Sequence, residues 1–231
     1  MTLIIAALRR HDLILTADGR STTRTNGKVT GINDSLQKLF PVRDHPVVIG
    51  HLGVNNLHDG GPIDHLIANF VAQLNTGNFT ILQIGEELRH FAQLTVRDRL
   101  DELEKNGQGC AFWVAGFGFR EDEPTVIEIF WSFKEGAFVT EEHQFKPISI
   151  VLGGDGKRLV KGADWTKVDG KSLEQVHDYH VSLMTQALTT KVQDNPVGGH
   201  IHEVVIDQAE WKWTHPPAKP TSAPSTTQHA G

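Results

Sequence analysis

The chain has 231 residues, which is enough for one substantial domain. Hydrophobic residues make up 39% and charged residues 22%, a composition typical of a folded globular protein and not of a disordered one. The formal net charge of −6 argues against a general nucleic-acid binder, because such proteins bind phosphates with clustered Lys and Arg.

The first part of the chain predicts strands. Residues 3–8 and 13–17 are short, nearly uninterrupted apolar runs, as in strands that are buried on both faces. Residues 19–33 are rich in Ser, Thr, Gly and Asn and predict a loop. Two further apolar runs, residues 37–42 and 47–52, predict the next pair of strands.

Helical periodicity begins at Pro62. Apolar residues then recur at spacings of three and four, as on one face of a helix: Ile63, Leu66, Ile67, Phe70, Val71 and Leu74. A second helix is predicted for residues 81–104. Strands return at residues 111–117, 125–133, 137–140 and 148–152. Ser172 and Gln175 form a capping box that predicts the start of a third helix, and residues 201–206 predict a last strand.

This order of elements indicates one domain over residues 1–213. Strands, two helices, strands, one helix and a strand follow one another with short strand-to-strand connections, which favours an α+β fold with antiparallel sheets. Residues 214–231 contain four prolines and no large apolar residue, so they predict a disordered tail.

Several features of the sequence predict a cytoplasmic location. The apolar part of the N-terminus precedes its arginines, the reverse of a secretory signal, and no apolar run approaches the roughly 20 residues of a membrane span. The single cysteine, Cys110, cannot form an internal disulfide. Its apolar neighbours indicate a small buried side chain and not a nucleophile.

The second residue offers a functional hypothesis. Removal of Met1 would leave Thr2 with a free α-amine. A threonine hydroxyl becomes a nucleophile when a base takes its proton, and a terminal amine with a pKa of about 7.7–8.0 can be that base. Very many proteins begin Met-Thr, so the position alone indicates little.

The order of several motifs adds to this. They are Thr2-Leu3-Ile4-Ile5, Asp18-Gly19-Arg20, Lys38, Gly50-His51-Leu52-Gly53, Val114-Ala115-Gly116-Phe117 and Asp194-Asn195-Pro196-Val197-Gly198-Gly199. In this order and spacing, over residues 2 to about 210, they resemble the proteasome β-type subunits and their bacterial relative HslV, which are N-terminal nucleophile (Ntn) threonine peptidases. Two substituted serines and a longer loop before Lys38 make the stand-alone betaproteobacterial proteasome homologue the closest type.

The resemblance implies a fold and an assembly. The fold would be the Ntn-hydrolase fold, a four-layer αββα sandwich with two antiparallel sheets between helix layers. The protein would be a self-compartmentalising threonine endopeptidase that hydrolyses unfolded proteins or peptides inside a double ring of identical subunits, six or seven per ring, with seven favoured. No cofactor, metal, nucleic acid or membrane is expected, and an ATPase unfoldase partner is left open.

The resemblance also assigns roles by position. Thr2 would be the nucleophile with its own amine as general base, and Asp18 and Lys38 the buried ion pair beside it. The N–H of Gly53 would bind the oxyanion, and Asp194 would support the amine. Lys28 remains a rival for the lysine role because of the longer loop. Substrate specificity would come from five residues: Ser21, Leu36, Phe40, His51 and Asn55.

Two departures from the family pattern alter the expected proton network. The turn Gly153-Gly154-Asp155-Gly156 and position Val197 both lack the family's serine, so water or Asp155 would substitute. A non-catalytic or small-amide-hydrolysing member of the same fold therefore stays open, as does an unrelated binding module.

Thirteen histidines invite a metal interpretation. His200 and His202 share a strand face, and His177 and His180 share a helix face. No metal-binding motif accompanies either pair, so we interpret them as packed or solvated residues.

Overall fold

The computed structural model describes residues 2–25, 28–54, 56–57, 61–74, 78–105, 109–143, 148–191, 195 and 197–217. Two predicted site residues, Asn55 and Asp194, lie outside these ranges, as do residues 218–231 of the predicted tail. Within the ranges, none of the helices combines the length and the apolar character needed to cross a membrane.

The first of two large sheets is built from both ends of the chain. Its strands stand in the order β12 (Ser149–Gly153), β1 (Ile4–Leu8), β2 (Asp12–Ala17), β13 (His202–Asp207) and β14 (Trp211–His215). Every neighbouring pair is antiparallel. β14 ends beyond the domain boundary predicted at residue 213.

The second sheet uses the middle of the chain. Its order is β11 (Ala137–His143), β10 (Thr125–Ser132), β9 (Cys110–Gly116), β6 (Val47–Gly53) and β5 (Leu39–Pro41), again antiparallel throughout. Its strands lie close to the ranges that their apolar runs predict, and so do those of the first sheet except β14, which was not predicted.

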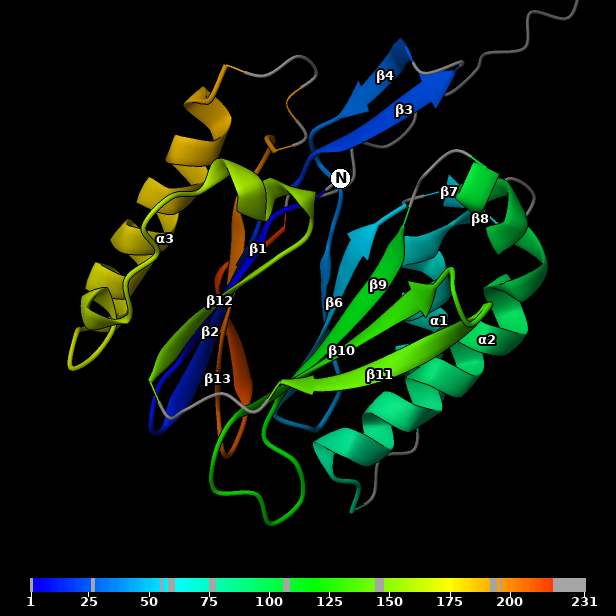
Figure 1. Cartoon of the computed structure of the whole chain (residues 1–231). Helices are drawn as coiled ribbons and strands as arrows, with labels where there is room; N and C mark the ends of the chain where they lie inside the picture. The colour runs from blue at the N-terminus through cyan, green and yellow to red at the C-terminus, as the bar shows by residue number, and fades with distance from the viewer. Residues whose placement is uncertain are drawn as a thin grey trace, which may run out of the picture.

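Helices lie on the outer sides of the two sheets (Figure 1). α1 (Ile63–Gln73) and α2 (Ile81–Lys105) pack on the second sheet, and α3 (Leu173–Thr189) lies over the first. The capping box predicted for α3 is confirmed, because Ser172 Oγ accepts the Gln175 N–H and the Gln175 side chain accepts the Ser172 N–H.

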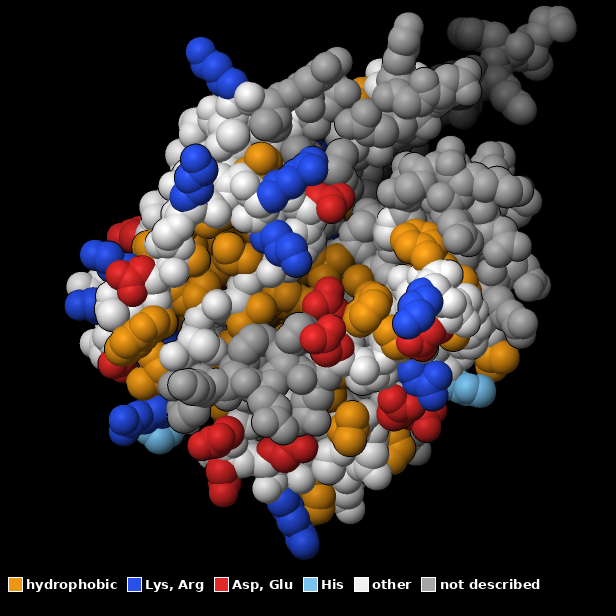
Figure 2. All heavy atoms as spheres, viewed as in Figure 1, with side chains coloured by type: hydrophobic (Ala, Val, Ile, Leu, Met, Phe, Trp, Pro, Cys, Tyr) orange, Lys and Arg blue, Asp and Glu red, His pale blue; other side chains and the backbone are white. Residues whose placement is uncertain are grey.

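One hydrophobic core lies between the two large sheets. Ile4, Ala6 and Leu8 of β1 face the second sheet, where Trp113 and Leu52 meet them, while Leu3 and Ile5 face α3. Coverage on both faces explains why the β1 sequence is apolar without alternation. Figure 2 shows hydrophobic side chains gathered where the strands of the two sheets face one another, with charged side chains around them.

The predicted four-layer αββα sandwich is corrected by this structure. One helix alone, α3, lies over the first sheet in the described residues, and the 3₁₀ segments η1 (Asp155–Leu159) and η2 (Trp165–Lys167) occupy the connection before it. Leu159 and Val168 from this irregular connection cover part of the sheet that a second helix would cover. The result is a mixed α+β fold with mostly antiparallel sheets.

Two short ribbons stand apart from the large sheets. β3 (Ser21–Thr25) pairs with β4 (Lys28–Asn33), and β7 (Asn56–Leu57) pairs with β8 (Gly61–Pro62). The prediction of a loop over residues 19–33 is therefore wrong: two strands of this polar, Thr-rich segment pair with each other and stand away from the core (Figure 1).

Candidate active site

A buried ion pair lies at the end of β2. Lys38 Nζ is 2.8 Å from Asp18 Oδ1, and the two side chains are 0% and 1% exposed. Asp18 follows the last residue of β2 and Lys38 precedes β5, so the pair bridges the two large sheets. The side chain of Lys28, the rival lysine in β4, lies outside the described part of the chain.

The Asp18 carboxylate accepts four hydrogen bonds. Oδ1 accepts from Lys38 Nζ and from the Leu3 N–H, both at 2.8 Å. Oδ2 accepts from the N–H groups of Arg20 at 3.2 Å and Gly198 at 3.1 Å. Four donors replace the hydrogen bonds to water that this carboxylate loses on burial. The same four bonds join the beginning of β1, the end of β2, the segment before β5 and the segment before β13.

Main-chain contacts hold Thr2 in place. The Leu3 N–H binds Asp18, and the Thr2 carbonyl accepts the Gly156 N–H at 3.0 Å. Gly154, at φ 81°, passes so close that a Cβ there would lie 2.2 Å from the Thr2 oxygen. Only glycine fits such an approach at positive φ. The turn at residues 153–156, which lacks the family's serine, thus contacts Thr2 through its backbone.

The Thr2 hydroxyl is fully buried, and Oγ1 has no hydrogen-bond partner among the described residues. Buried hydroxyls are usually paired, because an unpaired one loses its hydrogen bonds to water. An unpaired buried hydroxyl on the residue before Leu3, whose N–H binds Asp18, is the kind of exception that occurs at functional sites.

Opposing effects act on the Lys38 ammonium. Burial lowers the pKa of Lys38 from its usual value, while Asp18 raises it in part and Arg20 lowers it further. A lysine with a lowered pKa gives up a proton more readily than a solvated one. It still places positive charge next to the start of β1 whenever it is protonated.

His202 supports the same lysine from β13. Its Nε2 accepts the Lys38 N–H at 3.1 Å, which requires a neutral ring. Burial and the nearby Lys38 lower the pKa of His202 to about 3, so the ring is neutral at ordinary pH. Its strand neighbour His200 is exposed, and its Nε2 lies 2.8 Å from the Pro216 carbonyl.

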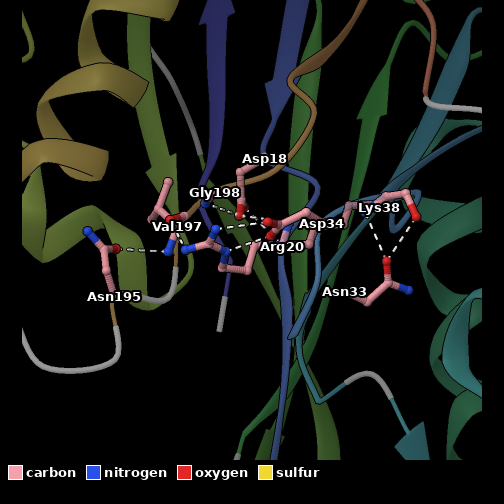
Figure 3. A network of polar contacts seen from close by, with 9 residues as sticks. Asp18, Arg20, Asn33, Asp34, Lys38, Asn195, Val197 and Gly198 are labelled. Carbon is pink, nitrogen blue, oxygen red and sulfur yellow. Dashed lines mark hydrogen bonds and ion pairs between the residues drawn. The ribbon is translucent and has the colours of Figure 1, made fainter. Parts of the chain in front are cut away.

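A second, more exposed ion pair borders the site. Arg20 Nε and Nη2 donate to the two carboxylate oxygens of Asp34 at 2.6 and 2.9 Å, and this guanidinium lowers the pKa of Asp34. Arg20 Nη1 also reaches the Val197 carbonyl at 3.5 Å. Figure 3 shows Arg20 between Asp34 and the backbone of residues 197 and 198, with Asp18 alongside.

Gly53 ends β6 with a conformation that other residues rarely adopt. Its φ is +95°, and a Cβ at this position would lie 2.1 Å from the Gly109 carbonyl oxygen. The close Gly109 carbonyl therefore requires glycine at this position. The family resemblance gave a different reason, the close approach of a substrate carbonyl.

The predicted specificity residues do not all face the same way. Phe40 packs in the core between the second sheet and its helices. His51 contacts Phe112 of the same core, with ring centroids 5.8 Å apart. His51 is fully buried with both ring nitrogens unpartnered among the described residues. Ser21 and Leu36 are half-buried near Gly19, whose carbonyl accepts the Leu36 N–H.

The loop after α3 is held by Asn195. Its Nδ2 donates to the Ala187 and Leu188 carbonyls at the end of α3, and its Oδ1 accepts the Val197 N–H at 3.0 Å. Val197, where the family has a serine, is fully buried against Leu3 and its neighbours. Asp155 is exposed, so its carboxylate is directed to solvent.

Two contributors to the site were not predicted from the sequence. His202 was interpreted as packed or solvated, although its alternation with Val204 and Ile206 places it on the face toward the second sheet. Gly156 gave no signal beyond membership of a glycine-rich turn. Backbone N–H and carbonyl groups are nearly the same in every residue, so their hydrogen bonds are difficult to predict from the sequence.

Comparisons with known proteins place the fold. The structure is similar to that of a Gly-1 mutant of Anbu from Hyphomicrobium sp. strain MC1, with a TM-score of 0.57 and 15% sequence identity. The match covers 95% of this chain and 88% of that one. The sequence itself matches no family model and no curated protein.

This similarity corrects the assignment of type. The betaproteobacterial proteasome homologue was expected as the closest relative within the β-subunit and HslV kind, but the matched structure is Anbu. Sequence identity of 15% over nearly the whole chain shows the fold alone and assigns no type within it. The chain therefore shares the fold of the Anbu structure.

Proposed function

We propose that this protein is a threonine-type peptide hydrolase in which Thr2 is the N-terminal nucleophile after removal of Met1. The observation that carries the proposal is the sharing of one oxygen. Asp18 Oδ1 accepts both the Lys38 ammonium and the N–H of the residue that follows Thr2, each at 2.8 Å. The ammonium is thereby held two hydrogen bonds from the Thr2–Leu3 peptide group.

The proposed reaction is amide hydrolysis in two stages. The free α-amine takes the proton of Thr2 Oγ1, which attacks the substrate carbonyl, and the Lys38 charge stabilises the developing negative oxygen of the nucleophile. The Gly53 N–H binds the oxyanion, a contact whose loss in other enzymes costs about 3–4 kcal/mol. The amine protonates the leaving nitrogen, and water activated by the amine then hydrolyses the ester.

Asp18 is assigned a positioning role. With four hydrogen-bond donors its carboxylate is committed to holding Lys38 and the main chain. It offsets the cost of burying the ammonium and fixes its position. In this proposal Asp18 takes no proton from substrate.

The test is an active-site adduct. The protein is incubated with a peptide epoxyketone, which reacts with a hydroxyl and an amine on the same residue, and intact mass is measured. We expect one adduct per chain in protein that has lost Met1, none in Thr2→Ala, and an undiminished adduct in the control Thr185→Ala, an exposed threonine on α3. An adduct that persists in Thr2→Ala would refute the assignment, and Met1 retained in the purified protein would favour a non-catalytic scaffold.

We further propose that identical copies assemble into a double ring that encloses the sites. Large apolar side chains are exposed on the outer helices, among them Leu82 and Leu94 of α2 and Leu173 and Leu188 of α3. Exposed apolar residues on two opposite sides of a subunit favour self-association. The preference for seven subunits rested on the corrected assignment of type, so ring size is left to native mass spectrometry. A monomer at micromolar concentration would contradict the proposal.

A further inference from the structure

A row of polar side chains crosses the first sheet on the face that α3 covers. Thr16 of β2 stands opposite Glu203 of β13, which in turn stands opposite His215 of β14. Directly opposed residues of antiparallel strands share a face of the sheet. This face is the reverse of the one on which His202 contacts Lys38.

Helix α3 adds two histidines to the row. His177 and His180 are three positions apart and so project from the same side of the helix. His177 Nδ1 is 3.1 Å from Glu203 Oε2, and His215 Nδ1 is 3.9 Å from Glu203 Oε1. The imidazole rings of His177 and His215 are stacked, with centroids 3.9 Å apart and planes 8° from parallel.

The Glu203 carboxylate is buried and oriented by hydroxyl groups. The residue is 2% exposed, and its two oxygens accept from Thr16 Oγ1 at 2.7 Å and Thr214 Oγ1 at 2.9 Å. Thr16 Oγ1 is also 2.7 Å from His180 Nδ1. A buried carboxylate whose hydroxyl partners leave lone pairs free toward two imidazoles is arranged as a ligand supported by an outer shell.

Two buried ring nitrogens in the row, His177 Nδ1 and His180 Nε2, lack a hydrogen-bond partner among the described residues. His177 Nδ1 is buried and makes no hydrogen bond within the described part of the chain, although a carboxylate oxygen lies 3.1 Å away. The two groups are close without the alignment of a hydrogen bond. Two atoms at this separation are positioned as neighbouring ligands of one small ion.

We propose that His177, Glu203 and His215 form a Zn²⁺ site. Their ligand atoms, one ring nitrogen of each histidine and a carboxylate oxygen, all lie within 4.8 Å of one another. Two imidazoles and a carboxylate suit zinc and other late first-row divalent ions, whereas Mg²⁺ and Ca²⁺ favour all-oxygen sets. His215 is half exposed, so its ring, which is stacked on that of His177, has room to turn until both rings direct a nitrogen at one ion.

Such a site would join three separate elements. His177 belongs to α3, Glu203 to β13 and His215 to the edge strand β14. A bound ion would fasten the only helix described over this sheet to the end of its edge strand. It does not depend on Thr2 chemistry, so its test is independent of the proposed peptidase activity.

The test is a calorimetric titration of ZnCl₂ into the untagged protein. Bound metal is first removed from the protein with a chelator. We expect saturable binding of one ion per chain. Binding should be lost in His177→Ala and in His215→Ala, and it should be unchanged in His90→Ala, an exposed histidine on α2. Thr214→Val, which removes an orienting hydroxyl, should weaken binding by about 10–100-fold.

Thermal unfolding gives a second measure that does not rely on calorimetry. Zn²⁺ should raise the Tm of the wild type and of His90→Ala while leaving that of His215→Ala unchanged. Circular dichroism before metal addition establishes that each variant is folded. Absence of stoichiometric binding by the folded wild type, or equal binding by His90→Ala and His215→Ala, would overturn the proposal.

Discussion

Lys38 and Asp18 are joined by a 2.8 Å ion pair from which solvent is excluded on both sides. A pair of this kind is strongly asymmetric in its energetics. Removing one member leaves the other as an uncompensated buried charge, whereas replacing both members by neutral groups can be nearly neutral for stability. The pair therefore predicts different outcomes for single and double substitutions.

Lys38→Met should destabilise the fold by about 3–5 kcal/mol, because Asp18 loses its buried counter-charge. Asp18→Asn in the same chain should restore much of this loss. The free energy of unfolding from urea titration measures both, and the double-mutant cycle gives the coupling. A single variant within about 0.5 kcal/mol of the wild type would show that the pair is not closed to solvent. Arg43, whose ion pair with Asp44 lies on the surface, supplies a control as Arg43→Met.

Buried histidines predict how stability depends on pH. Burial and then the nearby Lys38 lower the pKa of His51 from 6.5 to about 3. Between these values the unfolded chain binds more protons than the folded one, so the stability contributed is present above pH 6.5 and is lost as pH falls toward about 3. His51→Leu should flatten this slope in urea titrations at several pH values. The exposed His65→Gln should leave the slope unchanged.

The turn at Gly53 can be tested against a second glycine. Gly53→Ala would place a Cβ 2.1 Å from the Gly109 oxygen at a φ of +95°. Gly136→Ala meets a similar positive φ, +60°, with no atom within 4 Å of its Cβ. Gly136→Ala should lose about 1–3 kcal/mol of stability, the cost of a left-handed conformation for a residue with a side chain. Gly53→Ala should lose more. Equal losses would show that β9 moves aside at no cost.

The N-terminal cap of α3 offers a test of the helix that carries His177 and His180. Ser172→Ala removes the acceptor for the Gln175 N–H and should cost about 0.5–2 kcal/mol of stability. Ser182→Ala, on an exposed turn of the same helix, should cost much less. Comparable losses in the two variants would mean that the capping box contributes nothing specific.

Much of the fold was predictable because the signals are local. Apolar runs located β1, β2, β6 and β9, and the spacing of apolar residues located all three helices. The layering was not predictable in the same way. Whether a sheet face is covered by a helix or by irregular segments such as η1 and η2 depends on packing partners far away in the sequence. The β3–β4 hairpin was missed because a polar segment that pairs with itself looks like a loop.

The site was only partly visible in the sequence. Asp18 and Lys38 could be named because their motifs resemble those of a known family, and not from the residues around them alone. Strand alternation indicates the sheet face on which His202 lies. It does not indicate the hydrogen bond to the Lys38 N–H, because Lys38 is 164 positions away in the sequence. The Glu203 cluster was missed for the same reason: its members come from four segments, and no short motif contains them.

The peptide group between Thr2 and Leu3 is fastened at both of its polar atoms, its oxygen by Gly156 and its nitrogen by Asp18. Neither bond involves the residue that precedes the threonine. Excision of that residue by an aminopeptidase would thus change the charge at this spot without loosening the segment behind it. The new N-terminus of Thr2 would therefore already be in position for the proposed reaction, without a rearrangement of the main chain.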